Sequence, residues 1–572
     1  MKLRHTNLSR LADEEHDVLI VGGGINGAVS AACLSARGVR VALVDRGDFA
    51  GSTSQQSSNL AWGGIKYLES YELGLVRKLC LARNELIRAY PSTVQPIGFY
   101  LTHERGFRRS RLLLWLGTWL YWLIGSRFLK APRLLSVADI EHEEPIVRTD
   151  LADGGIEYQD AYLHDNDARF VWNFLRASLD HGAVLANYVE VTGATRDAAT
   201  GWRVTAKDVV GGRELTIKAR ILVNACGPFV DVLNSELKTT TLHKHTLSKG
   251  IHLIVPRLTA SRRVLSFFAN DGRLFFVIPM GPRTSIGTTD TPVSSPDVGV
   301  TPEDRRFVLD NINARLRLAK PLTEADIVAE RCGVRPLAVA RMAGHQKGEH
   351  ASKDWMQLSR KHVIEVHEGT ISIFGGKLTD CLNVGEEIFQ EVVRLGVSAR
   401  YPTRAWYGEP PPAVRDEFFH QADLMGLDAR TAKSSSEPLS TRLWRRYGSS
   451  ALGLLEAIRQ DPRQADLVIE NAEYIRCEIE EAARREMVTK LDDFLRRRSK
   501  ISLVVSREAI ERAEGLREAC RILFGDEADA RLAEYFAAHP ALPTLPAHPS
   551  SAAESRLVDD PQERPVHAAE EA

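Results

Sequence analysis

Three glycines near the N-terminus, Gly22, Gly24 and Gly27, have the spacing G-x-G-x-x-G, and the chemistry they suit is anion binding. In such a motif the first glycine permits a tight turn, the second lets the backbone approach a pyrophosphate, and the third lets a helix pack on a strand. Asp45 follows where a carboxylate would hydrogen-bond a ribose hydroxyl. The pattern predicts a dinucleotide site, and its alternative is a glycine-rich turn without a ligand.

The elements that must position these residues can be predicted from the flanking sequence. Residues 17–21 are an apolar, β-rich run, residues 28–36 are small enough for a closely packed helix, and residues 39–44 form a second apolar run. Further strands are predicted at residues 219–225, 275–279 and 370–374. This order of strand, helix and strand predicts an α/β fold with a doubly wound parallel sheet.

Two later segments end strands at glycines and could approach the same ligand. In ILVNACGP, residues 221–228, a predicted strand runs into a glycine turn. In FGGKLT, residues 374–379, the glycines precede a helical pattern, so backbone N–H groups could point at an anion. In a flavin enzyme that anion would be the reduced ring.

Composition limits the function classes. The 572 residues are too many for one core, so two or three domains are expected. With 44% hydrophobic residues, 26% charged residues and a net charge of −1, nothing indicates nucleic-acid binding. The seven cysteines form no C-x-x-C pair, which predicts neither a zinc site nor a disulfide framework and favours a reducing cytoplasm. Residues 1–16 lack the apolar core of a secretory signal.

The most apolar segment, residues 112–124, is too short to span a bilayer. As a helix it would place Trp115, Trp119 and Trp122 on one face, with basic residues at both ends. That arrangement suits a helix lying in a membrane interface. A buried helix of the main domain is the alternative, because apolar runs of this length are often core.

The chain resembles the FAD-dependent, quinone-linked glycerol-3-phosphate dehydrogenases along nearly its whole length. The matching segments, in the order of that family, are GGGINGA (22–28), GSTSQQSSNLAWGGIKYLE (51–69), DNDAR (165–169), NACGP (224–228), SKGIHLIVP (248–256), IGTTD (286–290), CGVRPL (332–337), FGGKLT (374–379) and RYGS (446–449). The resemblance implies FAD as the cofactor rather than NAD.

Domain limits follow from the resemblance together with composition. A run of three prolines at 410–412 separates the α/β region from helical, strongly charged patterns. We predict a doubly wound FAD-binding domain with an inserted mixed-sheet substrate domain over residues 14–405, and a C-terminal α-helical domain over residues 413–525. Flexible tails are predicted at residues 1–13 and 540–572, the latter because it is rich in proline and polar residues.

The family oxidises sn-glycerol 3-phosphate to dihydroxyacetone phosphate by hydride transfer to the flavin. The resemblance implies His252 as the base, with a buried packing histidine as the alternative. Arg335 would bind the phosphate through paired hydrogen bonds or form a structural ion pair. Lys377 would serve the substrate or the reduced flavin, and Lys66 and Tyr67 would complete the pocket.

The resemblance also implies a set of cofactor-binding residues. They are Gly22, Gly24, Ile25, Asn26, Gly27, Asp45, Arg46, Ser52, Thr53, Ser57, Ser58, Asn59, Val189, Ala225, Gly227, Gly376, Lys377, Leu378 and Thr379. No metal site is predicted.

Four positions depart from the family pattern. Asn59, Trp62 and Lys66 stand where the family commonly has lysine, histidine and arginine. Lys66 keeps the positive charge but loses the bidentate fork, and Trp62 cannot act as a base. Asp380 would cap the following helix or alter the electrostatics of the flavin. These changes leave the exact substrate open.

Three functions are therefore weighed. The first is a quinone-linked glycerol-3-phosphate dehydrogenase; the second is a related FAD-dependent dehydrogenase or oxidase for another hydroxy or amino substrate; the third is a flavin-binding structural protein. The expected partners are a small-molecule substrate and a quinone, and no nucleic acid. A homodimer and a cytoplasmic location, peripheral on the cytoplasmic membrane face, are further hypotheses.

Overall fold

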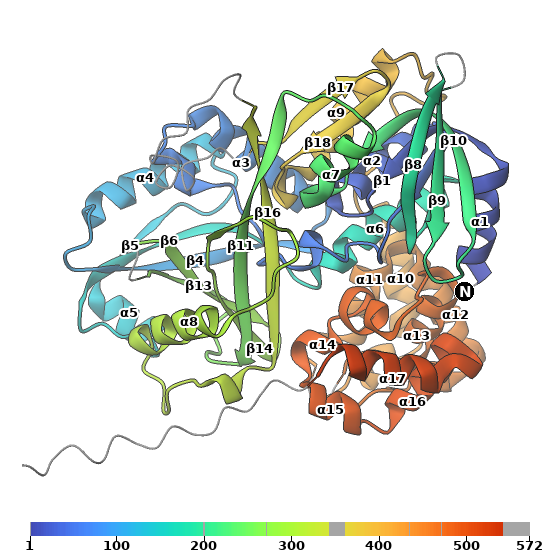
Figure 1. Cartoon of the computed structure of the whole chain (residues 1–572). Helices are drawn as coiled ribbons and strands as arrows, with labels where there is room; N and C mark the ends of the chain where they lie inside the picture. Colours follow the sequence, from blue (N-terminus) through green and yellow to red (C-terminus); the bar gives the residue numbers. More distant parts are fainter. Residues whose placement is uncertain are drawn as a thin grey trace, which may run out of the picture. The chain divides into compact units, whose positions relative to one another are not determined.

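The computed structural model describes residues 2–197, 201–269, 272–341, 361–433, 435–470 and 472–540. Within these residues the chain builds two β-sheets and a cluster of C-terminal helices (Figure 1). The predicted fold class, an α/β protein with a second mixed sheet and a C-terminal helical domain, is confirmed.

The first sheet carries the glycine motif. In the described residues it has eight strands, with the order β17-β18-β10-β1-β2-β7, and β9 pairs with β10 and β8. Its core is parallel, because β1 pairs in parallel with β2 and β10, and β18 extends β10 in parallel. The strands are β1 Glu15–Val21, β2 Val41–Val44, β7 Val184–Ala186, β8 Val189–Asp197, β9 Gly201–Asp208, β10 Glu214–Asn224, β17 Val363–His367 and β18 Thr370–Phe374.

Both faces of the central strand β1 are covered, which is why its sequence is apolar without alternation. Val18 and Ile20 pack with helices α2 and α9, whereas Leu19 and Val21 pack on the opposite face. Helix α2 (Ile25–Ala36) starts directly after the glycine turn and contacts α6 (Asp167–Asp180) and α9 (Cys381–Arg394). The predicted strand, turn and helix are thus confirmed.

The second sheet is mixed and has ten strands among the described residues, in the order β15-β11-β14-β13-β12-β4-β6-β3, with β16 on β11 and β5 on β6. The longest pairing joins β11 and β16, which are antiparallel over twelve residue pairs. The strands are β3 Leu60–Ala61, β4 Val94–Glu104, β5 Arg133–Leu135, β6 Ala152–Leu163, β11 His243–Pro256, β12 Val264–Phe268, β13 Leu274–Met280, β14 Arg283–Gly287, β15 Thr291–Val293 and β16 Ala329–Ala340.

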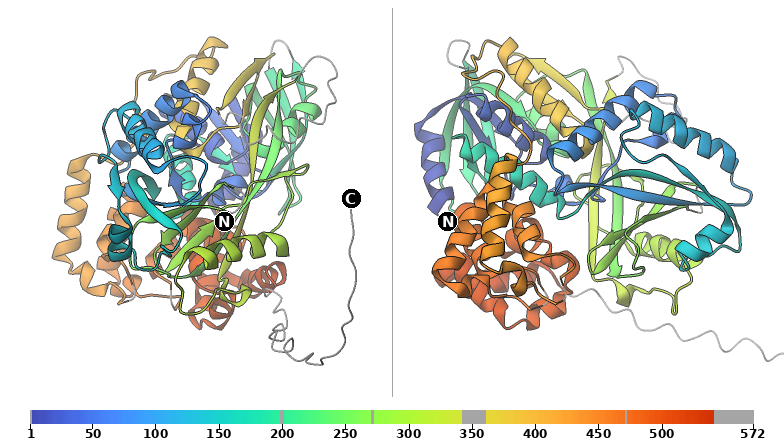
Figure 2. Two further views of the ribbon diagram at one scale, coloured as in Figure 1. Left: turned by 90° about the vertical axis from the view of Figure 1, so that its left-hand side faces the viewer. Right: turned by 180° about the vertical axis from the view of Figure 1, so that it is seen from behind.

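The C-terminal helices gather as one bundle, orange and red in Figure 2. Apolar residues of this bundle pack against Ile254 and Met280 of the second sheet. The helices are α10 Pro412–Leu424, α11 Leu439–Tyr447, α12 Ala451–Gln460, α13 Arg476–Arg485, α14 Ile501–Val504, α15 Arg507–Arg512, α16 Gly515–Phe524 and α17 Ala528–Ala538. Helical packing thus continues beyond the predicted end at residue 525.

The remaining helices lie in the α/β region. They are α1 Lys2–Asp13, α3 Leu73–Ala89, α4 Arg111–Ile124, α5 Val137–Glu143, α7 Val230–Glu236 and α8 Pro302–Arg315. Helix α4 confirms the helix expected at residues 112–124. No helix among the described residues is long and apolar enough to cross a bilayer.

The N-terminal segment is not the flexible tail that we expected. Residues 2–13 form α1, whose Leu8 and Leu11 are buried against the first sheet. Arg4 pairs with Asp208 at 2.6 Å and donates to the carbonyl of Asn187. The prediction for residues 1–13 is therefore wrong for 2–13, because nonlocal contacts order a segment with no local signal. The predicted tail beyond Pro540 lies outside the described residues.

Candidate active site

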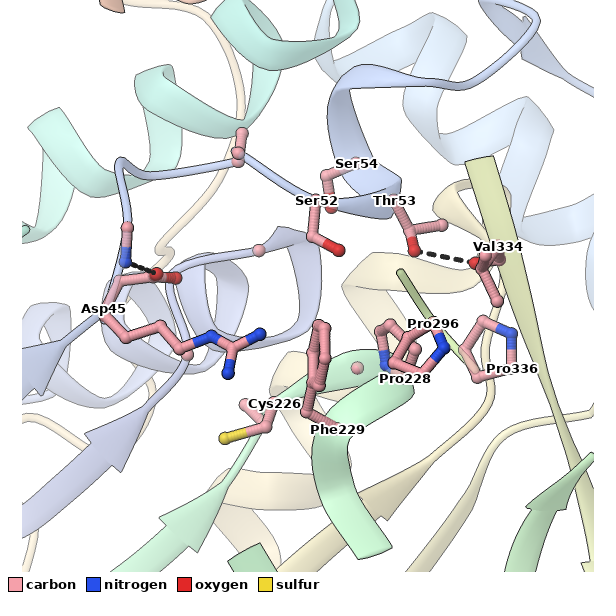
Figure 3. A pocket seen from close by; sticks show the side chains of 18 of the residues that line it. Asp45, Ser52, Thr53, Ser54, Cys226, Pro228, Phe229, Pro296, Val334 and Pro336 are labelled. Carbon is pink, nitrogen blue, oxygen red and sulfur yellow. Dashed lines mark hydrogen bonds between the residues drawn. The ribbon is translucent and has the colours of Figure 1, made fainter. Parts of the chain in front are cut away.

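A long cavity of about 870 Å³ follows the carboxyl end of the first sheet. Its lining includes Asp45, Val189 and Gly376. Its size falls in the roughly 300–1,000 Å³ range of small-molecule sites, and its place matches the usual crevice of open α/β sheets. Figure 3 shows Ser52 and Thr53 on one side of this dinucleotide cavity, with Pro228 and Phe229 on the other.

Each of the three motif glycines is needed at its position for a different reason. Gly22 has a φ of 106°, and a Cβ there would lie 2.5 Å from the carbonyl oxygen of Ala225. A Cβ on Gly27 would lie 1.9 Å from the carbonyl oxygen of Gly22, so the helix could not approach the turn. Gly24 lines the cavity at the start of α2, where a pyrophosphate would meet backbone N–H groups.

Asp45 lies at the end of β2 and holds the turn as well as lining the cavity. Its Oδ2 accepts from the Gly23 backbone N–H at 2.6 Å and its Oδ1 from the Gly47 N–H at 2.8 Å. Burial raises the pKa of Asp45 to about 6, although the two backbone hydrogen bonds act in the opposite direction. The guanidinium carbon of Arg46 lies 3.9 Å from the ring centroid of Phe229.

The segment after Asp45 forms a wall of the same cavity. Thr53 Oγ1 donates to the carbonyl of Val334 at 2.7 Å, and the Ile25 N–H donates to Ser54 Oγ at 3.0 Å. The hydroxyl-rich segment is therefore fixed between β16 and the start of α2. Of the predicted cofactor residues, the following line this cavity: Gly22, Gly24, Ile25, Asn26, Asp45, Arg46, Ser52, Thr53, Val189, Ala225, Gly227 and Gly376.

A second cavity of about 300 Å³, which we call the basic cavity, adjoins the first. The two share lining residues, including Gln56 and Gly376. All five predicted catalytic residues line it: His252, Arg335, Lys377, Lys66 and Tyr67. Four further predicted cofactor residues that do not line the dinucleotide cavity also line it: Ser57, Ser58, Leu378 and Thr379. The structure therefore brings together predicted catalytic side chains that lie up to 311 positions apart, from Lys66 to Lys377.

His252 lies on β11 with its imidazole buried at the basic cavity. Neither ring nitrogen has a hydrogen-bond partner among the described residues. Burial, together with the charges of Arg331 and Arg335, lowers the pKa of His252 to about 3. The ring is thus neutral near pH 7 and can accept a proton from a group that enters the cavity.

Arg335 extends from β16 across Gly250, two residues before His252 on β11. Because alternate residues of a strand share a face, the guanidinium lies on the same side of β11 as the imidazole. Its Nη1 donates to Asp290 Oδ1 at 3.1 Å and its Nη2 to Thr288 Oγ1 at 3.0 Å. The ion pair that was one alternative for Arg335 is present, and the side chain still lines the cavity.

Lys377 lies between two aromatic rings of the cavity wall. Its Nζ is 4.3 Å from the ring centroid of Tyr67 and 5.5 Å from that of Trp62. A cation over an aromatic face is stabilised electrostatically. Trp62, where the family has histidine, thus supplies a face for the lysine instead of a titratable group.

Some of the residues predicted to bind the cofactor line neither cavity. Asn59 lines neither cavity: its amide donates to the carbonyls of Leu163 and Asp165, and its Oδ1 accepts from Arg331 at 2.7 Å. Gly27 is likewise covered inside α2. The side chain of Asn59 therefore has a structural role in buried hydrogen bonds, and a contact of this residue with the cofactor stays a prediction.

Asp380 occupies the N-cap position of α9, but its side chain does not cap the helix. Its Oδ2 pairs with Nδ1 of His362 at 2.7 Å, and His362 Nε2 contacts Glu387 at 2.8 Å. Burial opposes the charge on His362, yet the hydrogen bonds to both carboxylates raise its pKa. Asp380 is thus paired with His362, and with Nζ of Lys78 at 3.7 Å, outside both cavities, and the alternative in which it faces the flavin is not supported.

Several lining residues were missed from sequence. Arg273 and Phe276 line the basic cavity from the second sheet. Lys490 and Arg497, from the C-terminal domain, line the dinucleotide cavity. No local pattern marks these positions, because each reaches its cavity only through the packing of distant segments.

Comparisons with known proteins agree with this arrangement. The family described as FAD dependent oxidoreductase matches residues 17–357, more than half of the chain, and the family described as C-terminal domain of alpha-glycerophosphate oxidase matches residues 415–525. The aerobic glycerol-3-phosphate dehydrogenase of Staphylococcus aureus is 30% identical over 511 residues, which cover 86% of this chain and 87% of that protein. Glycerol-3-phosphate dehydrogenase 2 of Mycobacterium tuberculosis is 29% identical over 548 residues, covering 92% and 88%.

Solved structures show the same likeness. The glycerol-3-phosphate dehydrogenase of Bacillus halodurans complexed with FAD aligns with a TM-score of 0.67 at 25% identity, covering 94% of this chain and 97% of that one. The L-alpha-glycerophosphate oxidase of Mycoplasma pneumoniae with FAD bound shares the fold, with a TM-score of 0.53 at 17% identity over 70% of this chain and 99% of that one. The chain therefore belongs to the FAD dependent oxidoreductases, within the glycerol-3-phosphate dehydrogenase family, and its cofactor is FAD.

Proposed function

We propose that the protein oxidises the secondary alcohol of sn-glycerol 3-phosphate to dihydroxyacetone phosphate and passes the electrons to a quinone. FAD, when bound, supplies the acceptor for the hydride that leaves the substrate carbon. The observation that carries this proposal is the basic cavity, where a buried neutral imidazole and three basic side chains adjoin the dinucleotide cavity: His252, Lys66, Arg335 and Lys377.

His252 is suited to take the hydroxyl proton. Its ring is buried, neutral and part of the cavity wall, and neither ring nitrogen has a hydrogen-bond partner among the described residues. A hydroxyl that enters would satisfy one ring nitrogen, and buried polar atoms gain most from such pairing. Proton transfer to the imidazole would place a positive charge beside Arg335, so His252 must release the proton after turnover.

The phosphate dianion matches the cations of the same cavity. Arg335 offers a planar guanidinium that can bind phosphate oxygens in pairs. Lys66 and Lys377 add two positive charges on the wall that carries Tyr67. A phosphorylated substrate compensates this concentration of positive charge better than a neutral one.

A second candidate is oxidation of another hydroxy or amino compound, or transfer of electrons to oxygen. Trp62 favours it, because an indole lines the cavity where the family has histidine and narrows the space beside Lys377. Lys66 in place of arginine selects less strongly for a phosphate geometry. Flavin reduction by substrates of different shape should therefore be compared under the same conditions.

We also propose that α4 rests on a membrane surface, which would bring the protein to a quinone pool. The predicted tryptophan face is half-buried, since Trp115, Trp119 and Trp122 contact one another edge to face. The exposed face consists instead of leucines, each 44% to 59% exposed: Leu112, Leu113, Leu116, Leu120 and Leu123. Basic residues flank the helix at Arg108 and Arg127, and an apolar face with basic flanks suits an anionic interface. A homodimer and a cytoplasmic location stay predictions.

Anaerobic mixing with glycerol 3-phosphate tests the main proposal. We expect the flavin absorbance near 450 nm to bleach, and to recover when a soluble quinone is added. A panel of polyols, hydroxy acids and amines, followed by bleaching and by peroxide release in air, separates the second candidate. Persistence of the yellow colour with glycerol 3-phosphate, alongside bleaching by another compound, would replace the substrate assignment. Persistence with every compound would favour a structural flavoprotein.

A further inference from the structure

Three consecutive arginines of the C-terminal domain, Arg496, Arg497 and Arg498, are buried against the FAD-binding domain. They lie in a π-helical turn, Asp493–Arg498, between α13 and α14. Such wide turns are rare and occur frequently at functional sites. All three side chains make hydrogen bonds to one segment, residues 48–56, more than 440 positions earlier.

Arg498 and Arg497 hold the start of this segment. Arg498 binds both carboxylate oxygens of Asp48 at 2.9 Å, and Nε of Arg497 donates to Asp48 Oδ2 at 2.6 Å. Burial alone would raise the pKa of Asp48, but the two arginines outweigh it and hold that pKa below its ordinary value. Asn187 adds a hydrogen bond of 2.8 Å to Asp48 Oδ1. The carboxylate is thus fixed by charge and by geometry.

Arg496 and Arg497 hold the end of the segment. Arg496 donates to the backbone carbonyl of Gln55 and, at 3.2 Å, to Oε1 of Gln56. Nη1 of Arg497 donates to Oε1 of Gln55 at 3.3 Å. The segment is therefore held at both ends by arginines of the C-terminal domain.

The same segment also forms a wall of the dinucleotide cavity. Asp48, Gly51, Ser52, Thr53 and Ser54 line that cavity, and Gln56 lines both cavities. Arg497 also lines the dinucleotide cavity itself. The C-terminal domain and the cofactor cavity thus share one stretch of backbone.

Burial of Arg496 lowers the stability of the folded chain, so a contribution to folding stability does not explain why an arginine lies at this position. Burial, and then the nearby charge of Arg331, lowers the pKa of Arg496 to about 9. Its hydrogen-bond acceptors on the segment are neutral, and its Nη1 has no partner among the described residues. A buried cation with incomplete pairing destabilises a fold.

We propose that Arg496, Arg497 and Arg498 position residues 48–56 for FAD, so that the C-terminal helical domain acts as part of the cofactor site. An FAD pyrophosphate and ribityl chain need hydroxyl and backbone donors at fixed places, and a segment that the arginines already hold loses less conformational entropy on binding. Arg496 and Arg498 are positioning residues, because they act on FAD through the segment, whereas Arg497 both holds the segment and lines the dinucleotide cavity.

Arg496→Met is the discriminating variant, because it removes the grip on Gln55 and Gln56 without leaving a carboxylate unpaired. Ultrafiltration of the holoenzyme over a dilution series gives the dissociation constant for FAD. We expect that constant to rise at least tenfold, while circular dichroism and the limited-proteolysis pattern of the C-terminal domain stay unchanged. Arg496→Lys, which restores one charged donor, should recover part of the loss.

Arg484→Met is the matched control, since Arg484 lies in the same domain with a side chain 74% exposed and pairs with Glu480. It should retain the FAD affinity of the parent. If Arg496→Met binds FAD within twofold of the parent, the proposal is overturned. It is also overturned if the loss of FAD accompanies unfolding or protease sensitivity of the whole C-terminal domain, because the role would then be structural.

Discussion

Nη1 of Arg335 donates a 3.1 Å hydrogen bond to Oδ1 of Asp290, and both side chains line the basic cavity. The guanidinium also donates to Thr288 Oγ1, so its orientation is fixed before a substrate arrives. Preorganisation of this kind reduces the entropy lost when an anion binds. The ion pair is therefore compatible with the proposed phosphate site, because it orients the guanidinium without removing it from the cavity wall.

Arg335→Ala should raise KM for glycerol 3-phosphate by roughly 10- to 100-fold. A hydrogen bond to a charged group is worth about 1.5–3 kcal/mol, and each 1.4 kcal/mol is tenfold. Steady-state kinetics with a soluble quinone measures the change. Arg257→Ala, at an exposed position directly after β11, should leave KM unaltered. An unaltered KM in the Arg335 variant would remove this residue from the phosphate role.

His252→Asn should lower kcat by about 10²- to 10⁴-fold, the usual contribution of a general base. FAD content should stay at the parental level, because His252 lines the basic cavity and not the dinucleotide cavity. The ratio of flavin to protein absorbance and the rate of anaerobic flavin reduction report the two effects separately. Loss of FAD with normal turnover of the remaining holoenzyme would instead support a packing role for His252.

The stability of the enzyme should depend on pH through His252. The pKa of His252 is lowered to about 3 in the folded chain, whereas an unfolded histidine titrates near 6.5. Between these values the unfolded chain binds a proton that the folded chain does not, so stability falls as pH decreases from about 6.5 towards 3. Thermal unfolding midpoints at pH 7.5, 6 and 5 should decrease less in His252→Asn than in the parent. Parallel decreases would contradict the assignment of a buried neutral ring.

Lys377→Met should raise KM for glycerol 3-phosphate at least tenfold and shift the flavin potential much less. Lys377 lines the basic cavity beside Tyr67, whereas the dinucleotide cavity is lined by its neighbour Gly376. Kinetics and a dye-coupled redox titration distinguish the two roles. A large negative shift in potential with unchanged KM would assign Lys377 to the reduced flavin. Lys244→Met, at an exposed position of β11, is the control.

Replacing the exposed leucines of α4 by serine should reduce binding to anionic vesicles at least tenfold. The variant changes Leu112, Leu116, Leu120 and Leu123, whose burial in an interface would each contribute hydrophobic free energy. Cosedimentation with phosphatidylcholine vesicles containing phosphatidylglycerol measures binding, and salt should weaken it in the parent. Leu424→Ser, an exposed leucine of α10, should bind as the parent does. Equal binding by both variants would remove α4 from the lipid contact.

The cofactor turn could be predicted from sequence because its three glycines lie within six positions of one another. A Cβ on Gly27 is excluded by Gly22 itself, although the contacts that exclude one on Gly22 come from the distant residues Ala225 and Cys226. Strand β18 could also be predicted, and its predicted bounds, residues 370–374, match the structure. Periodicity and glycine spacing report such elements directly.

Other features needed the folded chain. The ordered helix α1 depends on Arg4 reaching Asp208, and the structural role of Asn59 depends on Arg331 reaching it from β16. Neither contact has a signature in its own segment. The environment of Asp380 could not be predicted for the same reason, because its partner His362 lies in another segment, directly before β17.

By itself the sequence determined that a dinucleotide turn exists and, through the family resemblance, that its ligand is FAD, and it predicted which basic residues and which histidine would do chemistry. Tertiary structure alone decided that Lys66, His252, Arg335 and Lys377 share one cavity, and that Arg496 to Arg498 reach the segment beginning at Asp48. The physical reason is the separation along the sequence of the residues that interact. Backbone motifs depend on neighbouring residues, whereas charge pairing and cavity lining depend on which distant segments pack together.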